Sequence, residues 1–127
     1  MSVVDVLEKS FVIEIFGTVL RNILRSSLGE SAGEAVLFFL RRGLGRDPFE
    51  AFWDNPKSVY QEMVNIFGVG AKILINILVM RINSEFGLNM SSERFVELMQ
   101  RGDEMSVEEI RSFLTKIAEL YERKEIK

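Results

Sequence analysis

Four carboxylates gather near the C-terminus, at Asp103, Glu104, Glu108 and Glu109, and carboxylates alone could hold magnesium or calcium. The segment lacks the spacing of a calcium-binding loop. Ser106 and Glu109 instead match a capping box, in which both side chains satisfy the first backbone amides of a helix. Acidic residues are also stabilising in the first turn of a helix. We therefore interpret this cluster as a helix start and predict no metal site.

Histidine and cysteine are both absent from the 127 residues. Without them the chain cannot form a thiol nucleophile, a Ser-His-Asp triad, a Cys/His zinc site or a His-ligated haem site. No Walker phosphate loop and no pair of catalytic carboxylates stands out. We expect no catalytic residues, no cofactor and no enzyme activity.

A glycine turn, Gly68-Val69-Gly70, joins two expected helices and is followed by Lys72. It resembles a helix-hairpin-helix motif, in which backbone amides at a helix N-terminus meet a nucleic-acid phosphate. Leu74 stands where that motif has a small residue, and the next helix is too apolar to face a duplex. We favour a turn that lets two helices cross closely, and we keep nucleic-acid binding through Gly68, Gly70 and Lys72 as the alternative.

The densest basic stretch would extend that alternative surface. In an antiparallel helix pair joined near Gly29, the early arginines would lie at the opposite end from the later ones. We therefore interpret them as separate cationic sites, with Arg41 and Arg42 the nearest candidates for nucleic-acid contact. The members of the stretch are Arg21, Arg25, Arg41, Arg42 and Arg46.

The formal net charge is −3, which disfavours a general nucleic-acid binder. No apolar run approaches the length of a spanning helix, and the N-terminal segment does not resemble a signal peptide. We expect a cytoplasmic protein without membrane contact. Few glutamines, many Glu and Arg residues and no cysteine indicate a thermophile source.

The apolar periodicity is helical almost throughout and predicts one all-α domain over residues 1–127, a compact bundle of five to seven helices. The expected helices are 12–25, 31–42 with Gly43 as its stop, 49–53, 56–67, 70–86, 91–101 and 106–125. Ser31 and Glu34 form a second capping box, and the second helix is expected to bury Phe39. Asp47-Pro48 and Asn55-Pro56 each place a capping side chain before a proline at the first helical position. Phe49, Phe52 and Trp53 are interpreted as a buried anchor.

Helix 70–86 is apolar nearly all round and is expected at the centre of the fold or of an oligomer. The last helix carries a coiled-coil-like seam. Residues 1–10 project a different apolar face, so we expect a separate turn or arm that packs elsewhere, such as on a partner chain. The predicted oligomer interface consists of Ile73, Ile77, Met80, Val107, Ile110, Leu114, Ile117 and Tyr121.

Short segments in a fixed order, Ser27-Leu-Gly-Glu-Ser-Ala, Asp54-Asn-Pro and Ile66-Phe-Gly followed by an apolar helix, mark residues 11–87. This set resembles the Nitrosopumilus-type output domain, a small all-helical domain of archaeal signalling proteins. The resemblance implies a helical regulatory or interaction module and brings no catalytic residues.

Our leading hypothesis is therefore a non-enzymatic regulatory or protein-interaction module. We expect it to form a homo-oligomer, with a homodimer favoured, and to contact protein partners rather than nucleic acid.

Overall fold

The computed structural model describes the backbone of residues 3–126 and the side chains of residues 8–124. This part of the chain contains seven helices and no strand, so the predicted all-α fold is confirmed. None of these helices is long and apolar enough to cross a membrane. The helices are α1 (Val3–Leu28), α2 (Glu30–Leu44), α3 (Pro48–Asp54), α4 (Pro56–Phe67), α5 (Gly70–Phe86), α6 (Ser92–Arg101) and α7 (Glu104–Ile126).

Helix α1 begins at Val3 and continues without a break to Leu28. The expected separate turn at residues 1–10 is therefore wrong for residues 3–10, whose backbone belongs to α1. The side chains of residues 1–7 lie outside the described part, so packing against a partner stays a prediction.

A single residue, Gly29, joins α1 to α2 with a φ of 93°. The capping box predicted at Ser31 and Glu34 is wrong, because α2 already begins at Glu30 and no side chain caps it. Glu34 instead pairs with Arg25 and Arg21 of α1. The tight joint brings Gly33 of α2 against the α1 backbone, and a Cβ at this position would force the two helices to shift.

Helix α2 ends two residues later than expected, at Leu44 with Gly45 in the left-handed conformation. Gly43 is therefore not its stop. It lies inside the helix, where the side chain of Glu62 from α4 takes the space that a Cβ would fill. Gly45 closes the helix, and its N–H donates to the carbonyl oxygen of Arg41 at 2.8 Å.

The two Asx-Pro starts are confirmed. Asp47 accepts hydrogen bonds from the amides of Phe49 and Glu50 at 2.8 and 3.0 Å, so α3 begins at Pro48. Asn55 accepts from the amide of Ser58 at 3.2 Å, and α4 begins at Pro56. In both helices the proline supplies a first residue that needs no hydrogen-bond donor.

Helices α5 and α6 have the expected bounds, with Gly87 and Gly102 as left-handed C-caps and Ser91 as the N-cap of α6. Helix α7 begins before Ser106, so the capping box predicted at Ser106 and Glu109 is wrong. Asp103 accepts a hydrogen bond from the Ser106 amide at 2.9 Å and takes the capping position. Ser106 itself is buried inside the first turn.

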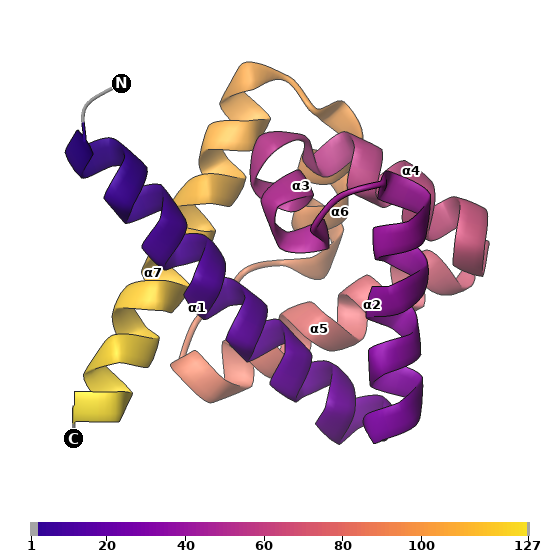
Figure 1. Cartoon of the computed structure of the whole chain (residues 1–127), viewed down its shortest axis with the longest axis horizontal. Coiled ribbons are helices and arrows are strands. Elements are labelled where there is room, and N and C mark those ends of the chain that lie inside the picture. The colour runs from indigo at the N-terminus through magenta and orange to yellow at the C-terminus, as the bar shows by residue number, and fades with distance from the viewer. Residues whose placement is uncertain (1–2, 127) are drawn as a thin grey trace.

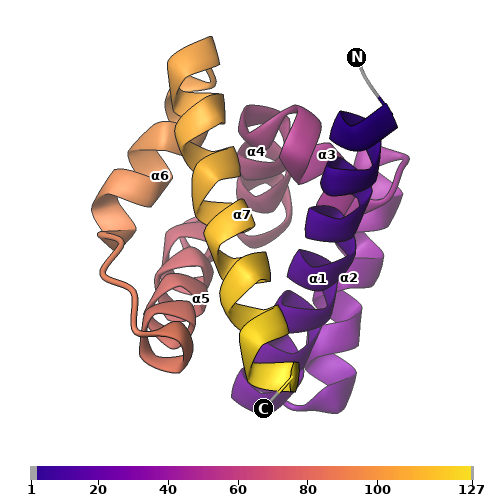
Figure 2. The ribbon, with the colours of Figure 1, turned by 90° about the vertical axis from the view of Figure 1, so that its left-hand side faces the viewer.

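The helices form a compact bundle in which α7 packs between α1 on one side and α5 and α6 on the other (Figures 1 and 2). Helices α1 and α7 cross, so the two ends of the chain contribute crossing helices to one core (Figure 1). The short helix α3 and helix α4 cover the remaining side of α1 and α2. Helix α5 lies at an edge of the bundle beside α6 (Figure 2).

A row of five phenylalanine rings connects four helices through the core. Phe16 of α1 lies 6.0 Å from Phe49 and 5.4 Å from Phe52 of α3, measured between ring centroids. Phe52 stacks on Phe95 of α6 at 6.0 Å, and Phe95 meets Phe113 of α7 at 5.7 Å. Such offset and edge-on pairs stabilise beyond their buried area. The anchor predicted at Phe49 and Phe52 is therefore confirmed, with Trp53 partly buried beside it.

Candidate functional site

The outer face of α5 carries apolar side chains that the fold leaves in solvent. Val69 is 89% exposed, Ile73 is 61% exposed and Met80 is 59% exposed, while Ile77 between them is partly exposed. We call Val69, Ile73, Ile77 and Met80 the α5 stripe. The opposite face of the helix is buried, through Ala71, Leu74, Ile75, Val79, Ile82 and Phe86. Of the two places predicted for this helix, the centre of the fold is therefore wrong, and the centre of an oligomer stays a prediction.

The α5 stripe is a single surface because its members are four, four and three residues apart. At about 100° per residue these positions fall within one narrow sector of the helix, and at 1.5 Å per residue they extend over about 16 Å. Lys72 and Asn76 flank the stripe and are exposed. Toward the C-terminal end of α5, the carboxylate of Glu85 lies 3.8 Å from the ammonium group of Lys124 on α7.

The predicted interface on α7 is largely wrong. Ile110, Leu114 and Ile117 are fully buried in the core of this chain, where α7 packs on α1, α5 and α6. They are unavailable to a partner. Val107 and Tyr121, at the two ends of the seam, are partly exposed. Of the predicted interface residues, Ile73 and Met80 are therefore the most accessible.

Two exposed aromatic residues lie on α2, away from the α5 stripe. Phe38 and Phe39 form an edge-on pair with ring centroids 5.5 Å apart, and Phe39 is 46% exposed, so its predicted burial is wrong. The crossing at Gly33 turns Val36, Leu37 and Leu40 inward, which leaves the two phenylalanines outside. The sequence carries a signal for this, because the buried positions repeat at three and four residues from Gly33 and exclude 38 and 39.

The Gly68-Val69-Gly70 turn joins α4 to α5 as predicted. Gly68 has a φ of 57°, and its carbonyl oxygen accepts a hydrogen bond from the Ala71 amide at 3.1 Å. Lys72 is exposed one turn into α5. The turn and the lysine are thus accessible.

The arginines are mostly engaged with carboxylates. Arg25 and Arg21 pair with Glu34, and Arg46 contacts Asp54 at 2.7 Å. The remaining members of the stretch, Arg41 and Arg42, are both exposed at the end of α2, where Arg41 lies 3.7 Å from Asp47.

The expected separation of the early and late arginines is wrong for one pair. Arg21 and Arg41 line the same small surface hollow, together with Glu34. The reason is that Arg21 lies two turns before Gly29, level with the middle of α2 rather than with its start.

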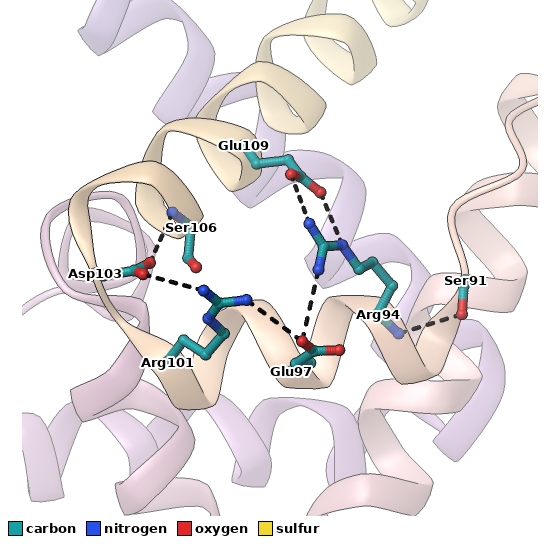
Figure 3. Close-up of polar contacts among 7 residues, drawn as sticks. All are labelled: Ser91, Arg94, Glu97, Arg101, Asp103, Ser106 and Glu109. Carbon is teal, nitrogen blue, oxygen red and sulfur yellow. Dashed lines mark hydrogen bonds and ion pairs between the residues drawn. The ribbon is translucent and has the colours of Figure 1, made fainter.

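An exposed network of charges fixes the corner between α6 and α7 (Figure 3). Arg94 contacts Glu109 at 3.0 Å and Glu97 at 3.6 Å. Arg101 lies 3.5 Å from both Glu97 and Asp103. The hydrogen bond and the charge of Glu109 raise the pKa of Arg94. Glu109 was expected to cap α7, but it pairs instead with Arg94 of the neighbouring helix α6.

The acidic cluster at the start of α7 contributes to this corner. Hydrogen bonds from the side chain and the amide of Ser106 lower the pKa of Asp103, and the charge of Arg101 adds to this effect. Within residues 8–124 no three acidic side chains are grouped closely enough to hold a metal ion. The carboxylates bind the amide of Ser106 and the guanidinium groups of Arg94 and Arg101, which is a structural role.

Comparisons with protein-family models, with curated proteins and with solved structures return no match to this chain. The resemblance of residues 11–87 to an archaeal signalling output domain therefore stays a prediction. The α5 stripe is an apolar surface that the described part of this chain leaves exposed.

Proposed function

We propose that this chain is a non-enzymatic helical interaction module that self-associates through the α5 stripe. The observation that carries the proposal is the exposure of Ile73 and Met80 on one side of α5, together with Val69 at the N-cap of that helix. Continuous exposed apolar surface on a soluble domain is typical of an interaction site. Full burial of one such side chain contributes about 1.5–3 kcal/mol, so several together can offset the cost of association.

A pair of α5 helices can cover each other when they run antiparallel around a two-fold axis. In that arrangement Ile73 of one copy faces Met80 of the other, and the two Ile77 side chains meet near the axis. Lys72 of one copy then approaches Arg81 of the other, since both are exposed cations of α5. Their long stems can cover apolar surface while the charges stay in water. A dimer is the simplest closed assembly that uses the stripe once per subunit.

The distribution of polar groups supports a non-enzymatic role. Among the described side chains Ser106 is the buried polar one, and its first-turn position at the start of α7 accounts for it. Many of the charged side chains form ion pairs at the surface, such as Arg94 with Glu109 and Arg46 with Asp54. A regulatory module of a signalling protein, as the resemblance implies, is the class of function that we propose.

Sedimentation and light scattering at increasing concentration test the proposal. We expect the wild-type chain to reach a dimer mass at micromolar concentrations and the variants Ile73→Glu and Met80→Glu to remain monomeric, because each buries a charge in the interface. Met105→Glu is the matched control, since Met105 is 83% exposed on α7, outside the stripe. A wild-type monomer at high micromolar concentration, or equal effects of all three variants, would contradict the proposal.

Nucleic-acid binding is the second candidate, and the accessible Gly68–Gly70 turn with Lys72 favours it. A gel-shift titration at several salt concentrations distinguishes the two functions, because phosphate contacts make binding strongly salt-dependent. Salt-steep binding that Lys72→Ala weakens and Lys116→Ala leaves unchanged would support this candidate. The absence of a gel shift at low salt would contradict nucleic-acid binding.

A further inference from the structure

A surface hollow of about 200 Å³ lies between α1, α2 and the start of α3. Its lining combines two guanidinium groups, those of Arg21 on α1 and Arg41 on α2, with apolar side chains. Among the apolar residues Leu37 and Phe49 are buried, whereas Phe38 is 59% exposed. The hollow is smaller than the pockets of about 300–1,000 Å³ that hold drug-sized ligands. It therefore suits a group of the size of a single ring.

The ring of Phe49 helps to place Arg21 at this hollow. The guanidinium carbon of Arg21 lies 5.8 Å from the centroid of the Phe49 ring, within the range of a cation–π contact. Gly17, one turn before Arg21, makes room for the ring, because a Cβ at Gly17 would lie 3.0 Å from it. The ring thus packs close to α1, within reach of the arginine side chain.

The carboxylates near the two arginines are engaged more closely by other groups. Glu34 also lines the hollow and lies 3.6 Å from Arg21, but the Nε of Arg25 donates to it at 2.9 Å. Asp47 lies 3.7 Å from Arg41, but it caps α3 by accepting from two backbone amides at 2.8 and 3.0 Å. Both arginine contacts are longer than the distance of about 2.7–2.9 Å that is typical of a charge-assisted hydrogen bond. Since a guanidinium has several N–H donors, each arginine can still bind another anion.

We propose that this hollow binds an aromatic phosphate monoester, a single ring that carries one phosphate group. Such a phosphate has a charge of about −1.5 to −2 and three acceptor oxygens, so Arg21 and Arg41 can bind different oxygens. A carboxylate has one charge and two oxygens, and it competes less well with Glu34 and Asp47. The ring packs against the exposed ring of Phe38. The residues of the α5 stripe do not line the hollow, so this binding is independent of self-association through the stripe.

A titration of the full chain with phenyl phosphate, inorganic phosphate, benzoate and benzylamine tests the proposal, with NMR shifts of the Leu37 methyl groups and the Phe38 ring as the readout. We expect phenyl phosphate to have a dissociation constant roughly threefold to tenfold lower than inorganic phosphate, because the aromatic contact adds to the ion pairs. Benzoate should bind more weakly than phenyl phosphate, and benzylamine should cause no shifts. The affinity for phenyl phosphate should fall as salt is added.

A tripeptide with a central phosphotyrosine distinguishes the two sources of this chemistry. Tighter binding of the tripeptide than of phenyl phosphate would indicate a phosphorylated segment of a partner protein. Weaker binding would indicate a free aromatic phosphate.

Two variants separate the roles of the charge and the ring. Arg41→Gln should raise the dissociation constant for phenyl phosphate about tenfold, whereas Arg123→Gln, the same change at an exposed arginine of α7, should retain the wild-type value. Phe38→Ala should reduce the preference for phenyl phosphate over inorganic phosphate, and thermal midpoints show that each variant is folded. Absent shifts at Leu37 and Phe38, equal affinity for phenyl phosphate and inorganic phosphate, or equal effects of Arg41→Gln and Arg123→Gln would each overturn the proposal.

Discussion

Gly33 of α2 lies against Leu24 of α1 so closely that a Cβ built on the glycine would be 2.9 Å from the Leu24 carbonyl carbon. Because the contact is with backbone, neither partner can rotate away. We expect Gly33→Ala to lose about 1–2 kcal/mol of stability, since overpacking outweighs the gain of about 1 kcal/mol in helix propensity. The thermal midpoint should fall by roughly 4–8 °C, measured by circular dichroism.

Gly43→Ala is the control for this prediction. Its new Cβ would meet only the side chain of Glu62, which can move toward solvent. We expect this variant to be as stable as the wild type or more stable, by up to about 1 kcal/mol. If both alanines had the same effect, the close crossing of α1 and α2 would not be the cause.

Phe52 is the central member of the phenylalanine row, in contact with both Phe16 and Phe95. Phe52→Ala should cost about 3–5 kcal/mol, because it leaves a cavity where α1, α3 and α6 meet. Phe38→Ala, at an exposed ring, should cost less than about 1 kcal/mol. Urea denaturation of the two variants measures the difference, and similar midpoints would show that the row is not a main source of stability.

Asp54 of α3 pairs with Lys9 of α1 and with Arg46 in the connection between α2 and α3, and its protonation should weaken the fold in acid. Burial raises the pKa of Asp54, but the hydrogen bonds and charges of Arg46 and Lys9 lower it more, so the net shift is downward. A lowered pKa means that the stabilisation is complete above the unfolded value of about 3.9 and is lost as the pH falls through the folded value. We expect Asp54→Asn to be less stable than the wild type at pH 6.

The same linkage predicts that the thermal midpoints of Asp54→Asn and the wild type converge toward pH 2. Glu122→Gln, at an exposed residue of α7, is the matched control and should follow the wild-type curve. A constant difference between Asp54→Asn and the wild type at all pH values would show that the side chain acts by packing rather than by charge.

Asp103 caps α7, whereas no side chain caps α2, and the two helix starts can be compared by mutation. Asp103→Ala should lose about 1 kcal/mol, because the Ser106 amide loses its acceptor. Ser31→Ala should have almost no effect, since Ser31 lies inside α2 and no side chain caps that helix. The thermal midpoints of both variants measure the difference. A larger loss of stability for Ser31→Ala would show that Ser31 caps α2 after all.

Helix starts with a local cause could be predicted from the sequence, and those with a competing tertiary contact could not. Asp47-Pro48 and Asn55-Pro56 place the acceptor and the proline next to each other, so no other element is needed. Glu34 and Glu109 belong to equally good local motifs, but Arg25 and Arg94 from neighbouring helices bind them. A pattern within four residues contains no information about such a partner.

The candidate interaction surface shows the same limit at a larger scale. Apolar periodicity identified the faces of α5 and α7, but it could not indicate which face this chain covers itself. Ile117 is buried by α1 and its neighbours, whereas Ile73 is exposed, although both are isoleucines on apolar faces of their helices. The difference arises because α5 lies at the edge of the bundle and α7 between two layers of helices (Figure 2).

Trp53 is the only tryptophan of the chain, and it lies where α3 meets α7. The guanidinium of Arg111 is 5.1 Å from the centroid of its ring, and the Arg111 Nε donates to the Trp53 carbonyl oxygen at 3.0 Å. Intrinsic fluorescence therefore reports the docking of the last helix onto the short third helix, not the integrity of the whole core. If α7 detached first under denaturant, emission would change before the far-ultraviolet helical signal, and the chain would thus carry its own local probe.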